Sequence, residues 1–283
     1  MKTKHILIII AVLLAVSPLL GLLLGKWVDY WRIATNLGDE PAYIALTILL
    51  FYLVDPHLGV NVLIALSTGA WLDVFMKNLF KLPRPPSELW LAPAEGYGFP
   101  SGHATTSTTF WTSLSLETRR REVYLLGAVT VAIVCLSRII LNVHYPLDVA
   151  GGVVLGLFSS FSVYYATRKI TLKPWLASLA LALYGVAVSV LTFVQGDLNF
   201  VRLGGLLVGL AVYPLIREKI NFRKESLLTK TFLALVALVL AFGFTQVAKS
   251  QAPLAQFILY LATGSITVSL PLLRSKSRRK TTG

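Results

Sequence analysis

Apolar runs long enough to cross a lipid bilayer recur along almost the whole chain. A helix needs about 20 predominantly apolar residues to cross the hydrocarbon core, where no water is present to satisfy its backbone. Of the 283 residues, 55% are hydrophobic and only 14% are charged, and the mean hydropathy is +0.71. This composition excludes an ordinary soluble domain. The sequence therefore predicts an all-α fold, a polytopic transmembrane helical bundle.

The apolar runs predict about ten spans that are separated by short connections. The first run, residues 6–24, follows two lysines and could be a cleaved signal peptide, but its length favours a retained helix. Residues 26–40 are expected to be a polar connection in which Trp27, Tyr30 and Trp31 anchor the chain at the membrane interface. The remaining spans are expected at residues 41–54, 60–80, 101–116, 123–141, 147–167, 175–194, 200–216, 230–249 and 254–273.

Basic residues gather on one side of the membrane in this ten-span topology. The formal net charge is +13. Of the 26 Lys and Arg, 18 fall on the side that holds both termini, within residues 2–4, 119–121, 168–173, 217–230 and 274–280. By the positive-inside rule the termini of this integral, multi-pass membrane protein are cytoplasmic. Because the topology explains the positive charge, we expect no nucleic-acid partner.

Three short polar signatures interrupt the apolar sequence. Besides Lys81, they supply three cations, two imidazoles and one carboxylate, a set that suits phosphoryl transfer without a metal ligand or cofactor. The cations can neutralise phosphate oxygens, one imidazole can attack phosphorus, and the other can protonate the leaving oxygen. The topology puts all three signatures on the non-cytoplasmic face. Lys77 and Arg84 lie in the first (residues 77–85), Ser101, Gly102 and His103 in the second (100–103), and Arg138, His144 and Asp148 in the third (137–148).

The first signature places two cations on either side of a helix end. Pro83 and Pro85 remove backbone donors and force the chain out of helix, which lets Arg84 reach back toward Lys77. The two cations would then flank one phosphate. Extension of a basic side chain to the membrane interface is the more common role at a helix end, and we assign that role to Lys81.

The second signature predicts a segment of extended backbone that leads into the first turn of a helix. Free backbone N–H groups at such a turn bind anions, and Gly102 lets phosphate oxygens come close. Ser101 is expected at the N-cap, where its hydroxyl either donates to phosphate or only caps the helix. His103 is either an interfacial histidine or, next to a bound phosphate, the general acid that protonates the leaving oxygen.

The third signature combines a buried cation with a histidine and an aspartate. Arg138 lies at the outer end of an apolar helix, which is costly unless an anion is bound there. The turn at Tyr145 and Pro146 is expected to bring His144 back over the site. Asp148 would accept from one imidazole nitrogen so that the other presents its lone pair, as in catalytic triads. For the pair alone, a helix-capping Asp beside a surface His is the alternative.

The patterns K-x6-R-P, P-S-G-H and S-R-x5-H-x3-D resemble the type 2 phosphatidic acid phosphatase family, the lipid phosphate phosphatases, at every motif position. The resemblance implies a six-span core and a metal-independent reaction through a phosphohistidine. In that reaction His144 is the nucleophile, Asp148 orients it, and His103 is the acid. The residues that would hold phosphate are Lys77, Arg84, Ser101, Gly102 and Arg138.

The signatures stop at residue 148, which predicts a division of the chain. We expect a six-span phosphatase core at residues 1–170, a four-span C-terminal extension at 171–273 and a basic cytoplasmic tail at 274–283. By analogy within the family, the favoured substrate is a polyprenyl diphosphate of the undecaprenyl or dolichyl type, in the bilayer. Phosphatidic acid and phosphatidylglycerol phosphate are alternatives, and the sequence leaves the oligomeric state open.

Three further functions remain as alternatives. Residues 69–73 and the extra helices also resemble the glucose-6-phosphatase branch, whose substrate would be a soluble sugar phosphate. A lipid phosphotransferase would share the covalent intermediate. An anion transporter could use the cations as a binding cluster, but transport gives no reason for a His144–Asp148 pair.

Overall fold

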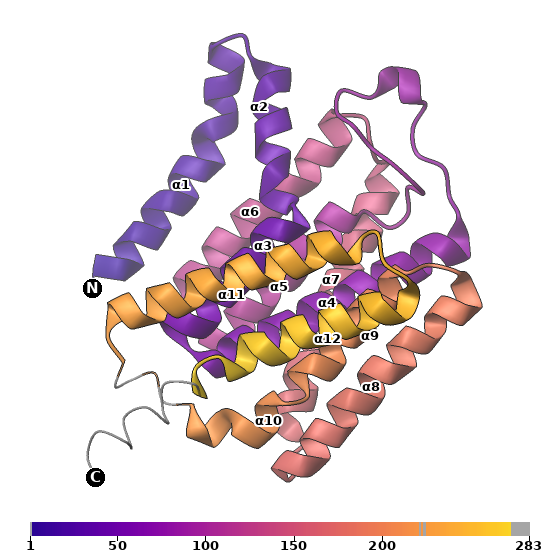
Figure 1. The fold of residues 1–283 in the computed structure, drawn as a ribbon. Coiled ribbons are helices and arrows are strands. Elements are labelled where there is room, and N and C mark those ends of the chain that lie inside the picture. Colours follow the sequence, from indigo (N-terminus) through magenta and orange to yellow (C-terminus); the bar gives the residue numbers. More distant parts are fainter. Residues whose placement is uncertain (1, 221, 223–224, 273–283) are drawn as a thin grey trace. The chain divides into compact units, whose positions relative to one another are not determined.

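The computed structural model describes residues 2–220, 222 and 225–272, and these residues are helical with no strand (Figure 1). The predicted all-α transmembrane bundle is confirmed. The predicted basic tail, residues 274–283, lies outside the described residues. The elements are α1 (Lys2–Leu23), α2 (Trp27–Ala34), η1 (Thr35–Gly38), α3 (Glu40–Leu49), η2 (Leu50–Val54), α4 (Pro56–Phe80), η3 (Ser87–Leu89), α5 (Gly102–Thr118), α6 (Arg121–Ile140), α7 (Pro146–Lys169), α8 (Pro174–Gln195), α9 (Asn199–Leu210), α10 (Tyr213–Ile216), η4 (Arg217–Lys219), α11 (Leu227–Ala248) and α12 (Pro253–Ser269).

The predicted number of spans, about ten, is not confirmed. Among the described residues, seven helices are long and apolar enough to cross a membrane, or up to eight if a bent pair counts as one span. Two other predicted spans form helices of only 17 residues, α5 and α12. Helix α5 also carries buried Ser and Thr side chains, so its hydropathy is low although its position is interior.

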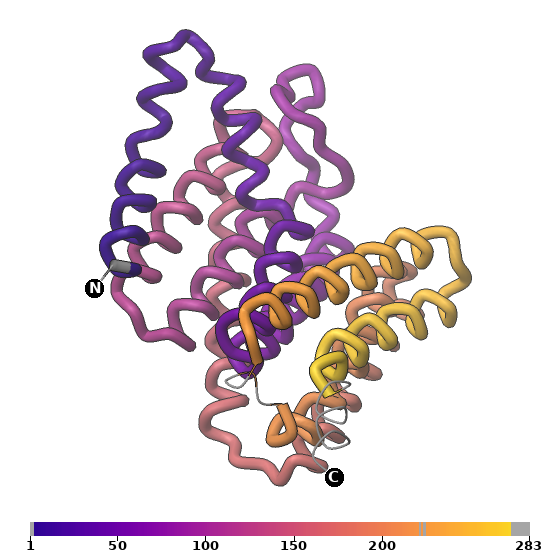
Figure 2. The backbone as a smooth tube through the Cα atoms, turned by 60° about the vertical axis from the view of Figure 1, so that its left-hand side comes forward, coloured from indigo at the N-terminus to yellow at the C-terminus, as the bar shows by residue number. Residues whose placement is uncertain are grey.

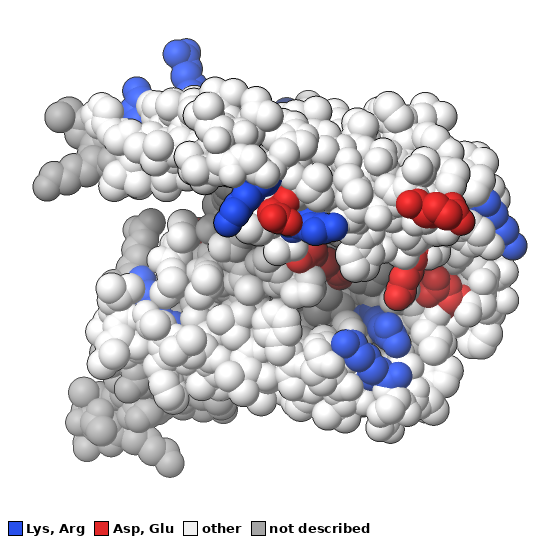
Figure 3. All heavy atoms as spheres, turned by 90° about the horizontal axis from the view of Figure 1, so that it is seen from above, with Lys and Arg blue, Asp and Glu red and all other residues white. Residues whose placement is uncertain are grey.

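Charged side chains are few on the face of the molecule that Figure 3 shows, where they form small patches on a mostly uncharged surface.

The prediction for residues 26–40 was wrong for Trp31. This segment folds into α2 and η1, and then bends by 49° into α3 and η2. Trp31 is not an interfacial anchor, because it is only 2% exposed and belongs to a buried cluster with Ala34, Leu141 and Val143. Burial of its indole ring against α6 releases more apolar surface from solvent than an interfacial position would.

The chain divides into two compact units. Unit 1 comprises Met1–Ile44 and Thr68–Ala166, and unit 2 comprises Ala45–Ser67 and Thr167–Gly283. In unit 1, α1 and α2 form a hairpin, and α1 runs alongside α6 in both views (Figures 1 and 2). The predicted functional division at residue 170 stays a prediction.

Helix α5 makes its hydrogen bonds inside unit 1. Ser160 on α7 donates to the Thr109 carbonyl at 3.0 Å, and the Ser113 hydroxyl donates to Ser160 at 3.0 Å. The close approach of α7 requires small residues, because a Cβ at Gly152 would lie 2.6 Å from the Ser101 carbonyl oxygen. Satisfied polar groups make a Ser- and Thr-rich helix tolerable in a membrane protein interior.

We expect Gly152→Ala to destabilise the protein and Gly243→Ala to leave it unchanged or slightly more stable. The added methyl group at residue 152 meets backbone, which cannot move without separating α7 from α5, at a cost of about 1–3 kcal/mol. Gly243 is the matched control, since a Cβ there meets nothing within 4 Å and alanine favours helix. Thermal unfolding midpoints in detergent measure both effects. Equal midpoints would show that the α5–α7 contact adapts.

Unit 2 is held together by close helix packing. Helix α9 packs against α8 and α12, and the three lie side by side in both views (Figures 1 and 2). Gly204 and Gly209 have no room for a side chain, because a Cβ would lie 2.4 Å from the Gly185 carbonyl oxygen and 2.3 Å from the Leu261 carbonyl oxygen, respectively. Tyr52 donates to the Thr267 carbonyl oxygen at 2.6 Å, which ties the segment 45–67 to α12.

Candidate active site

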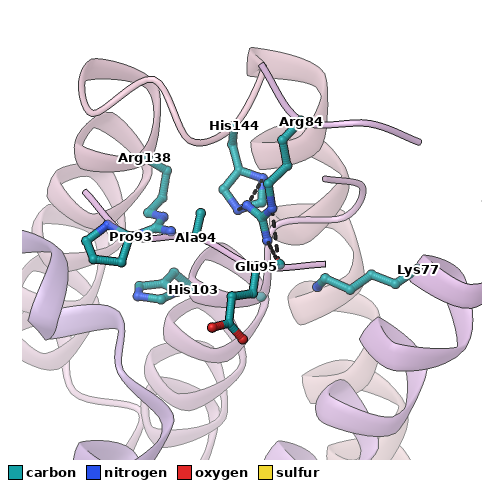
Figure 4. Close-up of a pocket in the computed structure, with 9 residues that line it drawn as sticks. Lys77, Arg84, Pro93, Ala94, Glu95, His103, Arg138 and His144 are labelled. Carbon is teal, nitrogen blue, oxygen red and sulfur yellow. Dashed lines mark hydrogen bonds between the residues drawn. The ribbon is translucent and has the colours of Figure 1, made fainter. Parts of the chain in front are cut away.

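The three polar signatures meet in unit 1 around one pocket of about 310 Å³ (Figure 4). The basic side chains and the two imidazoles reach it from different elements. Of the eight predicted site residues, six line the pocket, and Ser101 and Asp148 lie behind lining residues. The lining residues are Lys77, Arg84, Pro93, Ala94, Glu95, Gly102, His103, Arg138 and His144.

His144 lies in the connection between α6 and α7 and is only 3% exposed. Asn142, with a φ of 54°, reverses the chain after α6, and Pro146 begins α7. The imidazole Nδ1 is 3.3 Å from Asp148 Oδ2, an oxygen that also accepts from the Tyr145 backbone N–H at 2.9 Å. The predicted orienting contact is therefore present in the structure.

The other nitrogen of His144 faces Arg84, whose Nη1 is 2.7 Å from Nε2. A guanidinium only donates, so Nε2 must accept and carries the lone pair, while Nδ1 carries the proton toward Asp148. Arg84 itself is fixed by backbone carbonyl groups: Nη1 donates to Val143 at 2.9 Å, and Nη2 donates to Glu95 at 2.7 Å. These contacts favour the His144 tautomer with the proton on Nδ1 and the lone pair on Nε2, the nitrogen nearer to Arg84.

The side chain of Lys77 ends in the pocket. It forms an ion pair with Asp73, which lies one helical turn earlier on α4. Asp73 is 8% exposed and also accepts from the Thr105 hydroxyl at 3.1 Å. The sequence analysis assigned Asp73 no role at the site. Its position four residues before Lys77 was the signal, because residues i and i+4 share a helix face.

Arg138 lies in the last turn of α6 and is 5% exposed. Its Nη1 donates to Thr35 Oγ1 at 2.8 Å, whereas Nε is buried without a hydrogen-bond partner among the described residues. A buried guanidinium with an unused donor is costly unless an anion binds it. The geometry therefore favours an anion site beside Arg138.

Ser101 stands at the N-cap of α5, as expected, but its side chain makes no capping hydrogen bond. The hydroxyl is fully buried and has no partner among the described residues. The capping interpretation of this hydroxyl is therefore wrong, because the hydroxyl accepts no hydrogen bond from the first turn of α5. His103 follows in the first turn, and its Nε2 is 3.1 Å from Asp39 Oδ1, a contact that the sequence analysis missed.

His144 is held neutral in the ligand-free protein. Burial, and then the charges of Arg84, Arg138, Lys77 and His103, lower the pKa of His144 from 6.5 to about 2. Below pH 6.5 the unfolded chain takes up a proton at this residue that the folded chain does not. The stability that His144 contributes is therefore complete above pH 6.5 and is lost as the pH falls from there toward about 2.

We expect His144→Gln to be less sensitive to acid than the native chain. Glutamine does not titrate, so the difference in unfolding free energy between the two chains should shift toward the variant by about 1.4 kcal/mol per pH unit below the unfolded pKa. Thermal unfolding in detergent at a series of pH values between about 7 and about 5 measures this shift. A difference that does not change with pH would show that His144 titrates alike in both states.

Comparisons with known proteins agree with the motif positions. A model of the PAP2 superfamily matches residues 58–172, which contain all three signatures. Sphingosine-1-phosphate phosphatase 2 from Homo sapiens is 31% identical over 135 residues, which are 44% of this chain and 34% of that protein. This chain therefore spans only about a third of the length of that relative.

In two further comparisons the match covers a larger share of the related protein. An undecaprenyl-diphosphatase from Sulfolobus acidocaldarius is 30% identical over 153 residues, which are 49% of this chain and 74% of that protein. A crystal structure of a transmembrane PAP2-type phosphatidylglycerolphosphate phosphatase from Bacillus subtilis has 22% identity and a TM-score of 0.46, and the match covers 60% of this chain and 98% of that one. By the family match across the signatures and the identity over most of the Sulfolobus relative, the chain belongs to the PAP2 superfamily.

Proposed function

We propose that this protein is an integral membrane phosphatase that removes a phosphate from a lipid phosphate or diphosphate through a phosphohistidine at His144. The observation that carries the proposal is the buried His144, whose Nε2 lone pair is presented to a pocket lined by Lys77, Arg84 and Arg138. A neutral imidazole beside three cations suits attack on a phosphate anion. The similar proteins from Homo sapiens and Sulfolobus acidocaldarius are phosphatases of lipid substrates by name.

The first half-reaction forms one bond and breaks another at phosphorus. His144 Nε2 attacks phosphorus, and the P–O bond to the leaving group breaks with its electron pair on oxygen. His103 gives that oxygen a proton, so the leaving group departs as an alcohol or a phosphate monoester. Asp148 accepts from Nδ1 throughout and stabilises the positive charge on the phosphorylated ring. In the second half-reaction water attacks phosphorus, returns a proton to His103, and restores neutral His144.

Arg84 has to exchange partners as substrate binds. In the ligand-free protein its Nη1 lies beside the His144 ring, 2.7 Å from Nε2 and 3.5 Å from Nδ1. A phosphate oxygen is a stronger acceptor than a neutral imidazole, so the anion draws this donor away and releases the lone pair. The remaining bonds of Arg84 to backbone carbonyls, among them Nη2 to Glu95, keep the guanidinium at the pocket. Substrate binding thus activates the nucleophile.

The distribution of charge supports an active site on the non-cytoplasmic face with cytoplasmic termini. Helix α5 begins at the pocket with Gly102 and has 17 residues, a length of about 25 Å. Three exposed basic residues, Arg119, Arg120 and Arg121, follow its far end. Basic residues at a membrane surface favour the cytoplasmic side, so the pocket belongs at the opposite one.

The pocket size supports recognition of a head group rather than of a whole lipid. A volume of about 310 Å³ holds a phosphate or diphosphate group and leaves a long tail in the bilayer between helices. We place polyprenyl diphosphate first among the substrates, because the undecaprenyl-diphosphatase relative is covered over most of its length. Other lipid phosphates share the same head-group chemistry.

The test is phosphate release by the purified protein in detergent, with a metal chelator present, from a panel of substrates. The panel contains a prenyl diphosphate, phosphatidic acid, phosphatidylglycerol phosphate, sphingosine 1-phosphate and glucose 6-phosphate. We expect chelator-resistant release that is fastest with the prenyl diphosphate. Faster release from glucose 6-phosphate would replace the lipid substrate with a sugar phosphate. The absence of release from every member would remove the phosphatase proposal and favour anion transport.

A further inference from the structure

We propose that Asp39 is a positioning residue that orients His103 and favours the protonated form of its ring that a general acid needs. This inference rests on the proposed function, since it concerns the proton that the leaving oxygen receives. Asp39 lies between η1 and α3, outside the three signatures and outside the region matched by the family model. Its Oδ1 is 3.1 Å from His103 Nε2.

The turn that carries Asp39 packs directly on His103. A Cβ at Gly38 would lie 2.9 Å from His103 Cδ2 and 2.8 Å from Val134 Cγ1, so only glycine allows the turn to approach the imidazole this closely. The same turn also holds a second site residue, because Thr35 accepts from Arg138 Nη1 at 2.8 Å. Residues 35–39 therefore form a support for the two site residues on the α2 side of the pocket.

Asp39 offsets the positive charge around the pocket, which no other described contact of His103 does. A general acid must carry its proton when the P–O bond breaks. Three cations line the same pocket, Lys77, Arg84 and Arg138, and like charges disfavour a further positive charge on His103. A carboxylate 3.1 Å from the ring opposes this effect. With Nε2 directed to Asp39, Nδ1 is the nitrogen that gives its proton to the leaving oxygen.

The two histidines of the site are therefore paired in opposite senses. His144 uses Nδ1 toward Asp148 and keeps Nε2 as a lone pair, whereas His103 uses Nε2 toward Asp39 and gives its proton from Nδ1. The Asp39–His103 pair is partly open, with 45% and 29% of the two side chains exposed. Pairs this exposed stabilise a fold by at most about 1 kcal/mol, so the contact matters for the proton rather than for folding.

The experiment compares Asp39→Asn with the native chain on a series of aryl phosphates, from 4-methylphenyl to 4-nitrophenyl phosphate. A 4-nitrophenolate departs without a proton, whereas a weakly acidic phenol needs one. We expect the variant to lose about 100-fold in kcat on 4-methylphenyl phosphate and less than about threefold on 4-nitrophenyl phosphate. Asp39→Glu should recover part of the loss. Asp29→Asn is the matched control, because Asp29 pairs with Arg32 on the exposed side of α2.

Two results would overturn the inference. One is an equal loss on all aryl phosphates, which would mean that Asp39 acts only on the fold. The other is a loss of the same size when Asp39→Asn is made in a His103→Gln background, since a residue that acts through His103 has no effect once the imidazole is gone. Vanadate binding by each variant shows that the pocket is folded. Failure of the proposed function is separate, because then His144→Ala would keep its phosphate release.

Discussion

Replacement of His144 by alanine should abolish phosphate release, with a loss of about 10⁴-fold or more in kcat. The variant lacks the nitrogen that forms the N–P bond in the proposed reaction, and the cations that remain can bind phosphate but cannot attack it. The measurement has two parts. Phosphate release gives the loss of turnover, and brief mixing with a ³²P-labelled substrate, followed by denaturation, should trap an acid-labile, base-stable adduct on the native chain only.

His57→Ala is the matched control for this substitution. His57 is a histidine of unit 2, where its ring stacks on Tyr213, and none of the described residues of unit 2 lines the pocket. The control should keep its turnover and its labelled adduct. Release that survives in His144→Ala would contradict a phosphohistidine at this residue. A labelled adduct that survives would place the covalent bond elsewhere in the chain.

The pocket could be predicted because the residues that line it lie mostly in short polar motifs within an otherwise apolar sequence. A lysine, an arginine or a histidine in an apolar chain is costly unless it has a function, so Lys77, Arg138 and His144 stand out in the sequence. The residues that hold these site residues in place cannot be recognised in the sequence. Asp39 and Thr35 lie in a polar connection where such residues are ordinary, and their contacts with His103 and Arg138 depend on the bend between α2 and α3.

The fold class was predictable for the same reason, but the number of spans was not. Hydropathy identifies helices whose exposed side chains are apolar and can face lipid. Helices α1, α8 and α11 are of this kind. Hydropathy fails for α5, because many of its Ser and Thr side chains are buried within unit 1, where Thr109 and Ser113 form hydrogen bonds, and the helix has a low hydropathy. It also failed for α2, because only tertiary contacts make Trp31 a core residue.

Asp148→Asn should reduce kcat by about 10³–10⁴-fold with little change in stability. The same oxygen of Asp148, Oδ2, accepts from the Tyr145 N–H at 2.9 Å and lies 3.3 Å from His144 Nδ1, so an asparagine carbonyl in its place can keep both contacts. The carbonyl is neutral, however, and is a weaker acceptor than a carboxylate. It would no longer stabilise the positive charge that the phosphorylated His144 ring carries in the proposed reaction. Steady-state turnover and thermal midpoints in detergent measure the two expectations.

The split between binding and turnover distinguishes this role from a purely structural one. Asp148 touches His144 and not the phosphate pocket, so the vanadate affinity of Asp148→Asn should stay within about threefold of the native value while kcat falls. Arg138→Leu should instead lower the vanadate affinity together with kcat, because it removes a cation that lines the pocket and leaves the His144–Asp148 contact intact. A parallel loss of vanadate affinity and turnover in Asp148→Asn would mean that Asp148 only supports the pocket, and His144 would then owe its tautomer to Arg84 alone.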